Sequence, residues 1–166
     1  MFVRILTRRK KNIKKLFILL ASLFVVMSLV GCSSNKEENN QIANPWVEVD
    51  SLDEASKITG FTFDVPDTLD GKSITLIQVM NDELIEVRYG DDIIFRKGKG
   101  SEDYSGDFNS YELTKTENIN DVEVTLKGSG DTYNCVTFIV DDYSYSITTN
   151  NGLSLDAISD VINNGR

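Results

Sequence analysis

The side chains of this 166-residue chain that could support chemistry begin with its two thiols. Cys32 follows Leu29, Val30 and Gly31, so a small residue stands directly before a thiol that could be acylated. Cys135 lies in a stretch typical of a strand, where a free cysteine usually behaves as a small buried hydrophobe. The sequence has no histidine, which excludes Ser-His-Asp and Cys-His nucleophilic systems and the usual zinc sites. We therefore expect Cys135 to be unreactive.

The residues before Cys32 are organised like a secretory signal peptide. Seven basic side chains and no acidic one fall within residues 1–15, and residues 16–30 are apolar apart from Ser22 and Ser28. Such a run is short for a membrane-spanning helix, which needs about 20 residues, but it suits the apolar part of a signal peptide. An uncleaved membrane helix is the alternative. We expect residues 1–31 to be a signal peptide.

The four residues ending at Cys32 resemble the lipobox of bacterial lipoproteins. This resemblance implies cleavage before Cys32 and attachment of a diacylglycerol to its sulfur. Two or more acyl chains hold a protein stably on a bilayer, where a single chain does not. The protein would therefore sit at the extracytoplasmic face of the cell membrane, anchored through Cys32. Residues 32–44 are mostly polar, and we expect them to form a flexible tether.

The composition is acidic and excludes several partners. The net charge is −9, but residues 1–31 hold seven of the 17 basic residues and none of the 26 acids, so the mature chain is near −16. Nucleic acids and anionic head groups both attract basic surfaces, so we expect neither as a partner. Residues 45–166 have the length of a single domain. No cofactor is predicted for it.

Two helices with local start signals should frame the domain. Ser51 and Glu54 form a capping box and Gly60 offers a stop, which predicts a helix over 52–59. Its expected buried face holds Leu52, Ala55 and Ile58. Ser154 should cap a second helix over 155–163, with a buried stripe of Leu155, Ile158 and Ile162.

Between these helices the sequence is typical of strands separated by turns. The predicted strands span 73–80, 84–89, 93–97, 111–117, 122–127, 133–140 and 143–149. Alternating side chains in the fifth and seventh of these indicate one covered and one wet face. The fold class predicted is α+β, with a twisted antiparallel sheet of about six to seven short strands and two short capped helices.

Three cations, Arg96, Lys97 and Lys99, lie in or beside a glycine-containing stretch that ends near Asp107. They could hold a carboxylate or phosphate, although the stretch lacks P-loop spacing. The alternative is a solvated connection between strands. The acid pairs at turns lack EF-hand spacing, and no metal site is predicted. Tyr143 and Tyr145 share a sheet face, where they could pack in the core or line a ligand site.

Several segments together resemble a known family. They are Asn44-Pro45-Trp46, 50–55, Gly60-Phe61, Val65-Pro66, 94–103 and 143–147. In this order they resemble a family of Firmicute lipoproteins and anti-sigma-factor C-terminal segments classified as a domain of unknown function. The resemblance implies an extracytoplasmic module and no established activity, so it transfers no catalytic residue. The order of elements is also similar to that of the curved half-barrel carriers of lipids and lipoproteins.

The function expected from these observations is non-enzymatic. The leading hypothesis is a lipid-anchored module that binds or senses a protein or envelope component. The alternative is a carrier or chaperone that holds an apolar ligand, either a lipid or a lipoprotein, in a concave sheet. An enzyme with a carboxylate pair is a third hypothesis, which would need two acids facing each other in a pocket.

Overall fold

The computed structural model describes residues 44–164, which contain one open antiparallel sheet of nine strands and two helices. The fold is therefore α+β, as the sequence predicts. The predicted signal peptide, the residues Leu29, Val30, Gly31 and Cys32, and the tether up to residue 43 lie outside the described residues. Within residues 44–164, neither helix combines the length and apolarity needed to span a membrane.

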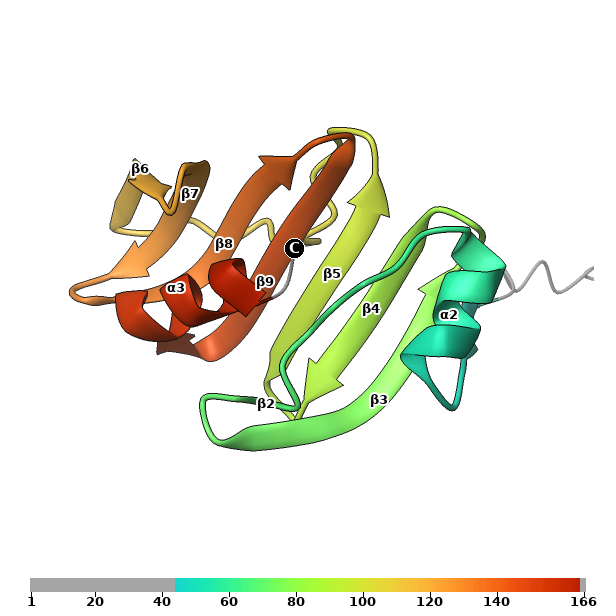
Figure 1. The fold of residues 1–166 in the computed structure, drawn as a ribbon. Helices are drawn as coiled ribbons and strands as arrows, with labels where there is room; N and C mark the ends of the chain where they lie inside the picture. The colour runs from blue at the N-terminus through green and yellow to red at the C-terminus, as the bar shows by residue number, and fades with distance from the viewer. Residues whose placement is uncertain (1–43, 165–166) are drawn as a thin grey trace, which may run out of the picture. The chain divides into compact units, whose positions relative to one another are not determined.

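The strands follow the chain in a nearly sequential order (Figure 1). Their order across the sheet is β1-β3-β4-β5-β9-β8-β7-β6, with β2 paired to β3. The strands are β1 (Trp46–Glu48), β2 (Thr68–Leu69), β3 (Lys72–Met80), β4 (Leu84–Tyr89), β5 (Ile93–Lys99), β6 (Leu113–Ile119), β7 (Val122–Ser129), β8 (Thr132–Val140) and β9 (Tyr143–Leu153). The sequential order is broken at two places: β1 pairs with β3 instead of β2, and β9 pairs with β5 as well as with β8.

The predicted count of six to seven strands is too low. All seven predicted strands are present, the one at 84–89 with its predicted bounds and the other six with shifted ends, but the described residues also contain β1 and β2. These two strands have three and two residues, which is too short for an alternating pattern to be recognised in the sequence. Both pair along the same edge of β3, through Trp46 opposite Met80 and Thr68 opposite Ser73. Pairing with β3 therefore defines both strands, at long range for β1 and across the two-residue turn Asp70-Gly71 for β2.

The first helix, α2 (Leu52–Thr59), has the predicted bounds because its start and stop signals are local. The Ser51 hydroxyl accepts a hydrogen bond of 3.2 Å from the Glu54 N–H. The Glu54 carboxylate in turn accepts one of 3.1 Å from the Asp50 N–H. Gly60 closes the helix in the left-handed conformation, at φ 78°.

The buried face of α2 differs from the prediction at one position. Ile58 is 43% exposed, whereas Ala55 and Thr59 are buried. Ala55 and Thr59 are one turn apart and share a face. Ile58 lies about 100° from Thr59 around the helix axis, at the edge of that face. The buried Thr59 hydroxyl is satisfied because it donates a hydrogen bond of 3.0 Å to the Ala55 carbonyl.

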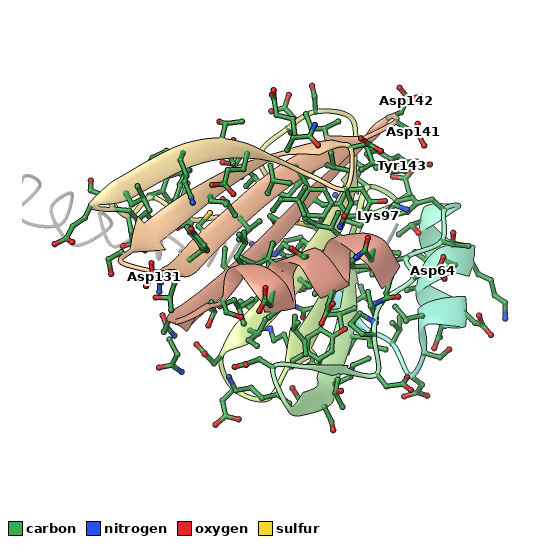
Figure 2. All side chains as sticks on the ribbon, turned by 60° about the vertical axis from the view of Figure 1, so that its left-hand side comes forward. Asp64, Lys97, Asp131, Asp141, Asp142 and Tyr143 are labelled. Carbon is green, nitrogen blue, oxygen red and sulfur yellow. The ribbon has the colours of Figure 1, made fainter. Side chains whose placement is uncertain are left out.

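The second helix, α3 (Leu155–Asn164), begins at the predicted cap. The Ser154 hydroxyl accepts a hydrogen bond of 3.2 Å from the Ala157 N–H. Ile158 and Ile162 are buried as predicted, and Val161 joins them. The helix lies across β8 and β9 (Figures 1 and 2), and its apolar stripe belongs to the hydrophobic core.

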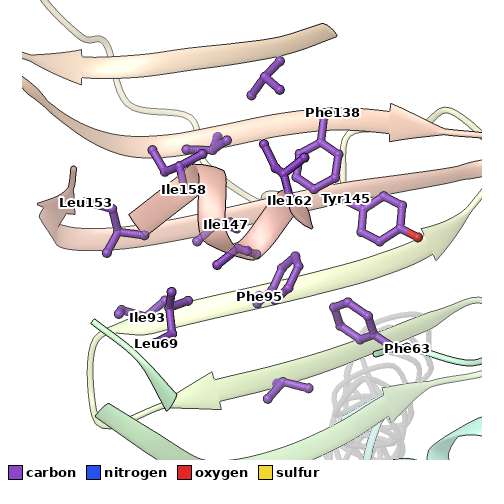
Figure 3. Packing of buried hydrophobic residues seen from close by; sticks show 14 of the residues in the cluster. Phe63, Leu69, Ile93, Phe95, Phe138, Tyr145, Ile147, Leu153, Ile158 and Ile162 are labelled. Carbon is purple, nitrogen blue, oxygen red and sulfur yellow. The ribbon is translucent and has the colours of Figure 1, made fainter. Parts of the chain in front are cut away.

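The core lies on the face of the sheet covered by α3 and by residues 60–66, which we call the front face (Figure 3). Residues 60–66 form no strand but cross the sheet between α2 and β2. There the Phe63 ring meets the Phe95 ring edge-on at 4.7 Å between centroids. Phe138 and Tyr145 stack at 4.9 Å. Tyr145 is therefore a core residue, one of the two roles that its sequence pattern allowed.

The opposite face of the sheet, which we call the back face, is not uniformly wet. Ser144 and Ser146 belong to the predicted wet face of β9, yet they are 5% and 1% exposed. The reason is that residues 100–112, the crossing connection, leave the end of β5 and pass behind the sheet to β6 (Figure 1). The prediction of a solvated strand face was wrong at these positions.

Candidate functional site

The three predicted anion donors, Arg96, Lys97 and Lys99, belong to β5, which continues two residues beyond its predicted end. Successive side chains of a strand point to opposite faces. Arg96 accordingly lies on the back face, whereas Lys97 and Lys99 lie on the front. The structure therefore does not bring the three cations together.

Arg96 forms part of a buried ionic network around Glu86, which is fully buried. Its guanidinium donates through Nε to one Glu86 carboxylate oxygen at 2.7 Å, and Nη2 lies 2.7 Å from the same oxygen. The other oxygen accepts from Arg88 at 2.6 Å and from Gln78 at 2.7 Å. Burial would raise the pKa of Glu86, but the two arginines outweigh it and hold the pKa below its usual value.

The same guanidinium holds the crossing connection against the back face. Nη1 of Arg96 donates to the carbonyl oxygens of Tyr104 and Ser105, at 2.8 and 2.6 Å. The Trp46 ring lies 5.8 Å from the guanidinium carbon. The ring of Tyr104 packs directly on Gly98, where a Cβ atom would collide with it. Arg96 therefore has a structural role: it clamps the crossing connection to the back face of the sheet.

Lys97 is buried on the front face with 7% of its surface exposed. Its ammonium donates a hydrogen bond of 2.8 Å to the Thr62 carbonyl. Three aromatic rings surround it, with centroids 4.6 Å away for Tyr143, 5.2 Å for Tyr145 and 5.7 Å for Phe61. The cation thereby ties residues 60–66 to the sheet.

The charge on Lys97 is also balanced by acids. Burial lowers the pKa of Lys97, and the charges of Asp64 and Asp141 oppose this shift. Figure 2 shows Lys97 next to Tyr143, at the end of the sheet where Asp141 lies. The remaining cation, Lys99, lies 3.6 Å from the Asp82 carboxylate. All three predicted anion donors thus already contact groups within the domain.

Cys135 lies on the back face beneath the crossing connection and is fully buried. Burial raises the pKa of its thiol to about 11, and the groups beside it include Ser105 and Asp107 of the crossing connection. A thiol that stays protonated and covered is a poor nucleophile. The predicted buried position of Cys135 is confirmed.

Two clefts open beside the crossing connection. The larger, which we call the acidic cleft, has a volume of about 390 Å³. Its wall is part of the crossing connection and its floor is formed by β7, β8 and β9. None of its three carboxylates forms an ion pair with any residue of the described range. It is lined by Ser101, Glu102, Asp103, Glu123, Thr125, Thr137, Phe138, Ile139 and Ser144.

The smaller cleft, of about 240 Å³, contains Asp92 and Asp107, whose carboxylates are already engaged. Asp92 accepts hydrogen bonds of 2.7 Å from both the Asn150 N–H and the Asn151 amide. Burial opposes the ionisation of Asp92, but these bonds and others lower its pKa to about 2. Asp107 accepts from the Tyr111 hydroxyl at 2.6 Å. The acidic cleft, whose three carboxylates form no ion pair within the described residues, is therefore the stronger candidate site.

Two apolar side chains on the back of the sheet are unexpectedly exposed. Phe108, on the crossing connection, is 97% exposed, and Ile139, in the acidic cleft, is 50% exposed. Neither exposure was predicted from the sequence. Ile139 could have been found, because alternation with the buried Val136 and Phe138 places it beside Thr137 on the outer face. No sequence pattern distinguishes Phe108 from a core aromatic residue.

Within residues 44–164, no group of three or more Cys, Asp or Glu side chains is arranged to hold a metal ion. In comparisons with family models, curated proteins and solved structures, the chain matches none. The resemblance to the Firmicute lipoprotein family therefore stays a prediction from the sequence.

Proposed function

We propose that this protein is a lipid-anchored, non-enzymatic binding or sensing module at the extracytoplasmic face of the cell membrane. The back of its sheet receives a protein or another envelope component. The observation that carries this proposal is Phe108, a large aromatic residue that is 97% exposed on a connection clamped by Arg96. Aromatic residues, Phe among them, are enriched in protein interfaces and contribute much of the apolar area buried there.

The packing of the front face favours a binding module over the carrier alternative. A lipid carrier needs an apolar cavity, but Phe63, Phe95 and Tyr145 fill the space between the sheet and its cover. An opening of about 490 Å³ lies between residues 66–70 and α3. Asp70 and Asp160 are part of its wall, which is unfavourable for an acyl chain.

The placement rests on the sequence around Cys32 and agrees with the charge of the domain. An acidic surface is repelled by anionic head groups, so the anchor, rather than the domain surface, holds the protein at the bilayer. The resemblance to Firmicute lipoproteins and anti-sigma-factor segments supports the same placement.

Cross-linking in intact cells tests the proposal. A photo-reactive amino acid is placed at Phe108 in the full-length, anchored protein, and a matched variant carries it at Ile58, an exposed apolar residue on α2. We expect a discrete cross-linked partner from position 108 that is absent from position 58. Identical patterns from both positions, or none from either, would contradict the proposal. A lipid that co-purifies stoichiometrically with the Cys32→Ala form would favour the carrier instead.

A further inference from the structure

From the acidic cleft we infer the chemistry of the partner: an extended peptide segment that carries Lys or Arg side chains and at least one apolar side chain. This inference rests on the proposed function and specifies the ligand of the back face. It combines the charge of the cleft, the exposed Ile139 and the shape of the floor.

Charge complementarity selects a cationic occupant. Glu102 and Asp103 line the wall of the cleft and Glu123 its floor. Asp141 and Asp142 lie at the end of the β8–β9 hairpin from which the cleft floor extends (Figure 2). A second copy of this acidic chain would meet like charges here. Cationic side chains are instead attracted electrostatically by each carboxylate. A cationic partner also associates faster in such a negative field.

The floor of the cleft favours an extended segment. Glu123 and Thr125 are alternate residues of β7, and Thr137 and Ile139 are alternate residues of β8. Alternate residues on a strand repeat about every 6.6 to 6.8 Å, which is also the repeat along one side of an extended peptide. A segment lying along the floor would place an apolar side chain on Ile139 and cationic ones against the acids.

The wall of the cleft is held in place before any partner binds. The carboxylate of Asp103 accepts a hydrogen bond of 2.9 Å from the Ser105 N–H. Ser105 itself is held through its carbonyl by Arg96 at 2.6 Å. Little ordering of the wall is therefore needed on binding, which lowers the entropic cost of association.

Peptide binding to the full-length lipidated protein in phosphatidylcholine nanodiscs tests the inference. The labelled probes are short peptides built from the repeats Lys-Ser-Val-Ser, Lys-Ser-Ser-Ser and Glu-Ser-Val-Ser, which we call Lys-Val, Lys-Ser and Glu-Val. Each repeat places the side chains that name the probe on one side of an extended chain. Empty nanodiscs measure the lipid binding of the probes. We expect affinity to fall from Lys-Val to Lys-Ser, with no binding of Glu-Val. Affinity should also weaken as salt is raised, because salt screens exposed charges.

Variants separate the cleft from the overall charge of the domain. The double variant E102Q/E123Q should bind Lys-Val about three- to tenfold more weakly. The control E48Q/E112Q makes the same charge change at exposed sites outside the cleft and should stay within about twofold. Ile139→Thr should weaken Lys-Val binding but leave Lys-Ser binding unchanged.

Equal losses in the two double variants would overturn the inference, because only net charge would then matter. Binding of the Glu-Val probe as tight as that of Lys-Val would overturn it as well. If position 108 still captures a partner in cells after either result, the proposed function stands and only the cationic segment is wrong. If the peptides bind as expected but position 108 captures nothing, the cationic segment stands and the proposed function fails.

Discussion

At the scale of single residues, the main electrostatic feature is one carboxylate inside the domain. Glu86 stands among apolar residues of β4, and the sequence shows it only as an acid between Ile85 and Val87. A buried charge is tolerated when it is paired and hydrogen-bonded. Donors on Gln78, Arg88 and Arg96 meet this requirement for Glu86.

Glu86→Gln should lower the free energy of unfolding by about 3 kcal/mol at neutral pH, because it leaves Arg96 without its buried counter-charge. Glu117→Gln is the matched control. Glu117 also pairs with a cation, Lys115, at 2.6 Å, but its side chain is 37% exposed, so the cost should be below about 1 kcal/mol. Urea unfolding followed by the fluorescence of the single tryptophan, Trp46, measures both. Equal losses would refute the special role of Glu86.

The pH dependence of this loss has a defined sign. The pKa of Glu86 is below its ordinary value of 4.5, so folding favours the ionised form. The stabilisation is therefore complete above pH 4.5 and is lost as the pH falls through the folded-state pKa. The stability difference between the parent protein and Glu86→Gln should shrink in acid. A difference that stays constant or grows in acid would show that the carboxylate is not ionised in the folded state.

At the scale of elements, the crossing connection determines what the back face can do. It covers Cys135 and the outer serines of β9, and it forms the wall of the acidic cleft. Arg96 holds it by hydrogen bonds, and the absence of a side chain at Gly98 leaves room for the ring of Tyr104. The wall of the proposed binding site thus depends on two residues of β5.

Gly98→Ala should push Tyr104 outward and loosen the connection, at a cost of about 1 to 3 kcal/mol in unfolding free energy. The Cys135 thiol, covered by the connection, should then react faster with a thiol reagent. Tyr104→Ala removes the ring that the new methyl group would meet, so Gly98→Ala should add little in that background. An unchanged thiol reaction rate in Gly98→Ala would show that this contact does not hold the connection.

At the scale of the whole molecule, the proposed function joins a strongly acidic domain to a lipid anchor. Each buried CH₂ of an acyl chain contributes about 0.8 kcal/mol to membrane binding. The acidic domain itself adds no attraction to anionic lipids. The proposed placement at the membrane therefore depends on acylation of Cys32.

Metabolic labelling with an alkyne-tagged fatty acid tests this dependence. The parent protein and a Cys135→Ser control should both incorporate the label, because the control keeps Cys32, the proposed acylation site. Cys32→Ala should incorporate none. Label that persists in Cys32→Ala would show that the fatty acid is attached at a residue other than Cys32.

The sequence predicted those elements that depend on interactions between residues close together in the chain, and it missed elements that depend on distant ones. The helix at 52–59 was predicted to the residue because its cap and stop lie within ten positions, from Ser51 to Gly60. Seven strands were also recognised from local patterns, namely strand-forming runs separated by turn residues, with clear alternation in two of them. The strands β1 and β2 were missed because only their pairing with β3 defines them.

The candidate site was less accessible from the sequence. Arg96 and Lys97 were grouped as neighbours, but β5 continues through them and sends their side chains to opposite faces. The sequence by itself determined the helices, most strands, the acidity and the burial of Cys135, because each follows from local pattern or composition. Only the tertiary structure decided that residues 100–112 cover the back face and form a cleft there. Such cover depends on contacts between segments that are distant along the chain.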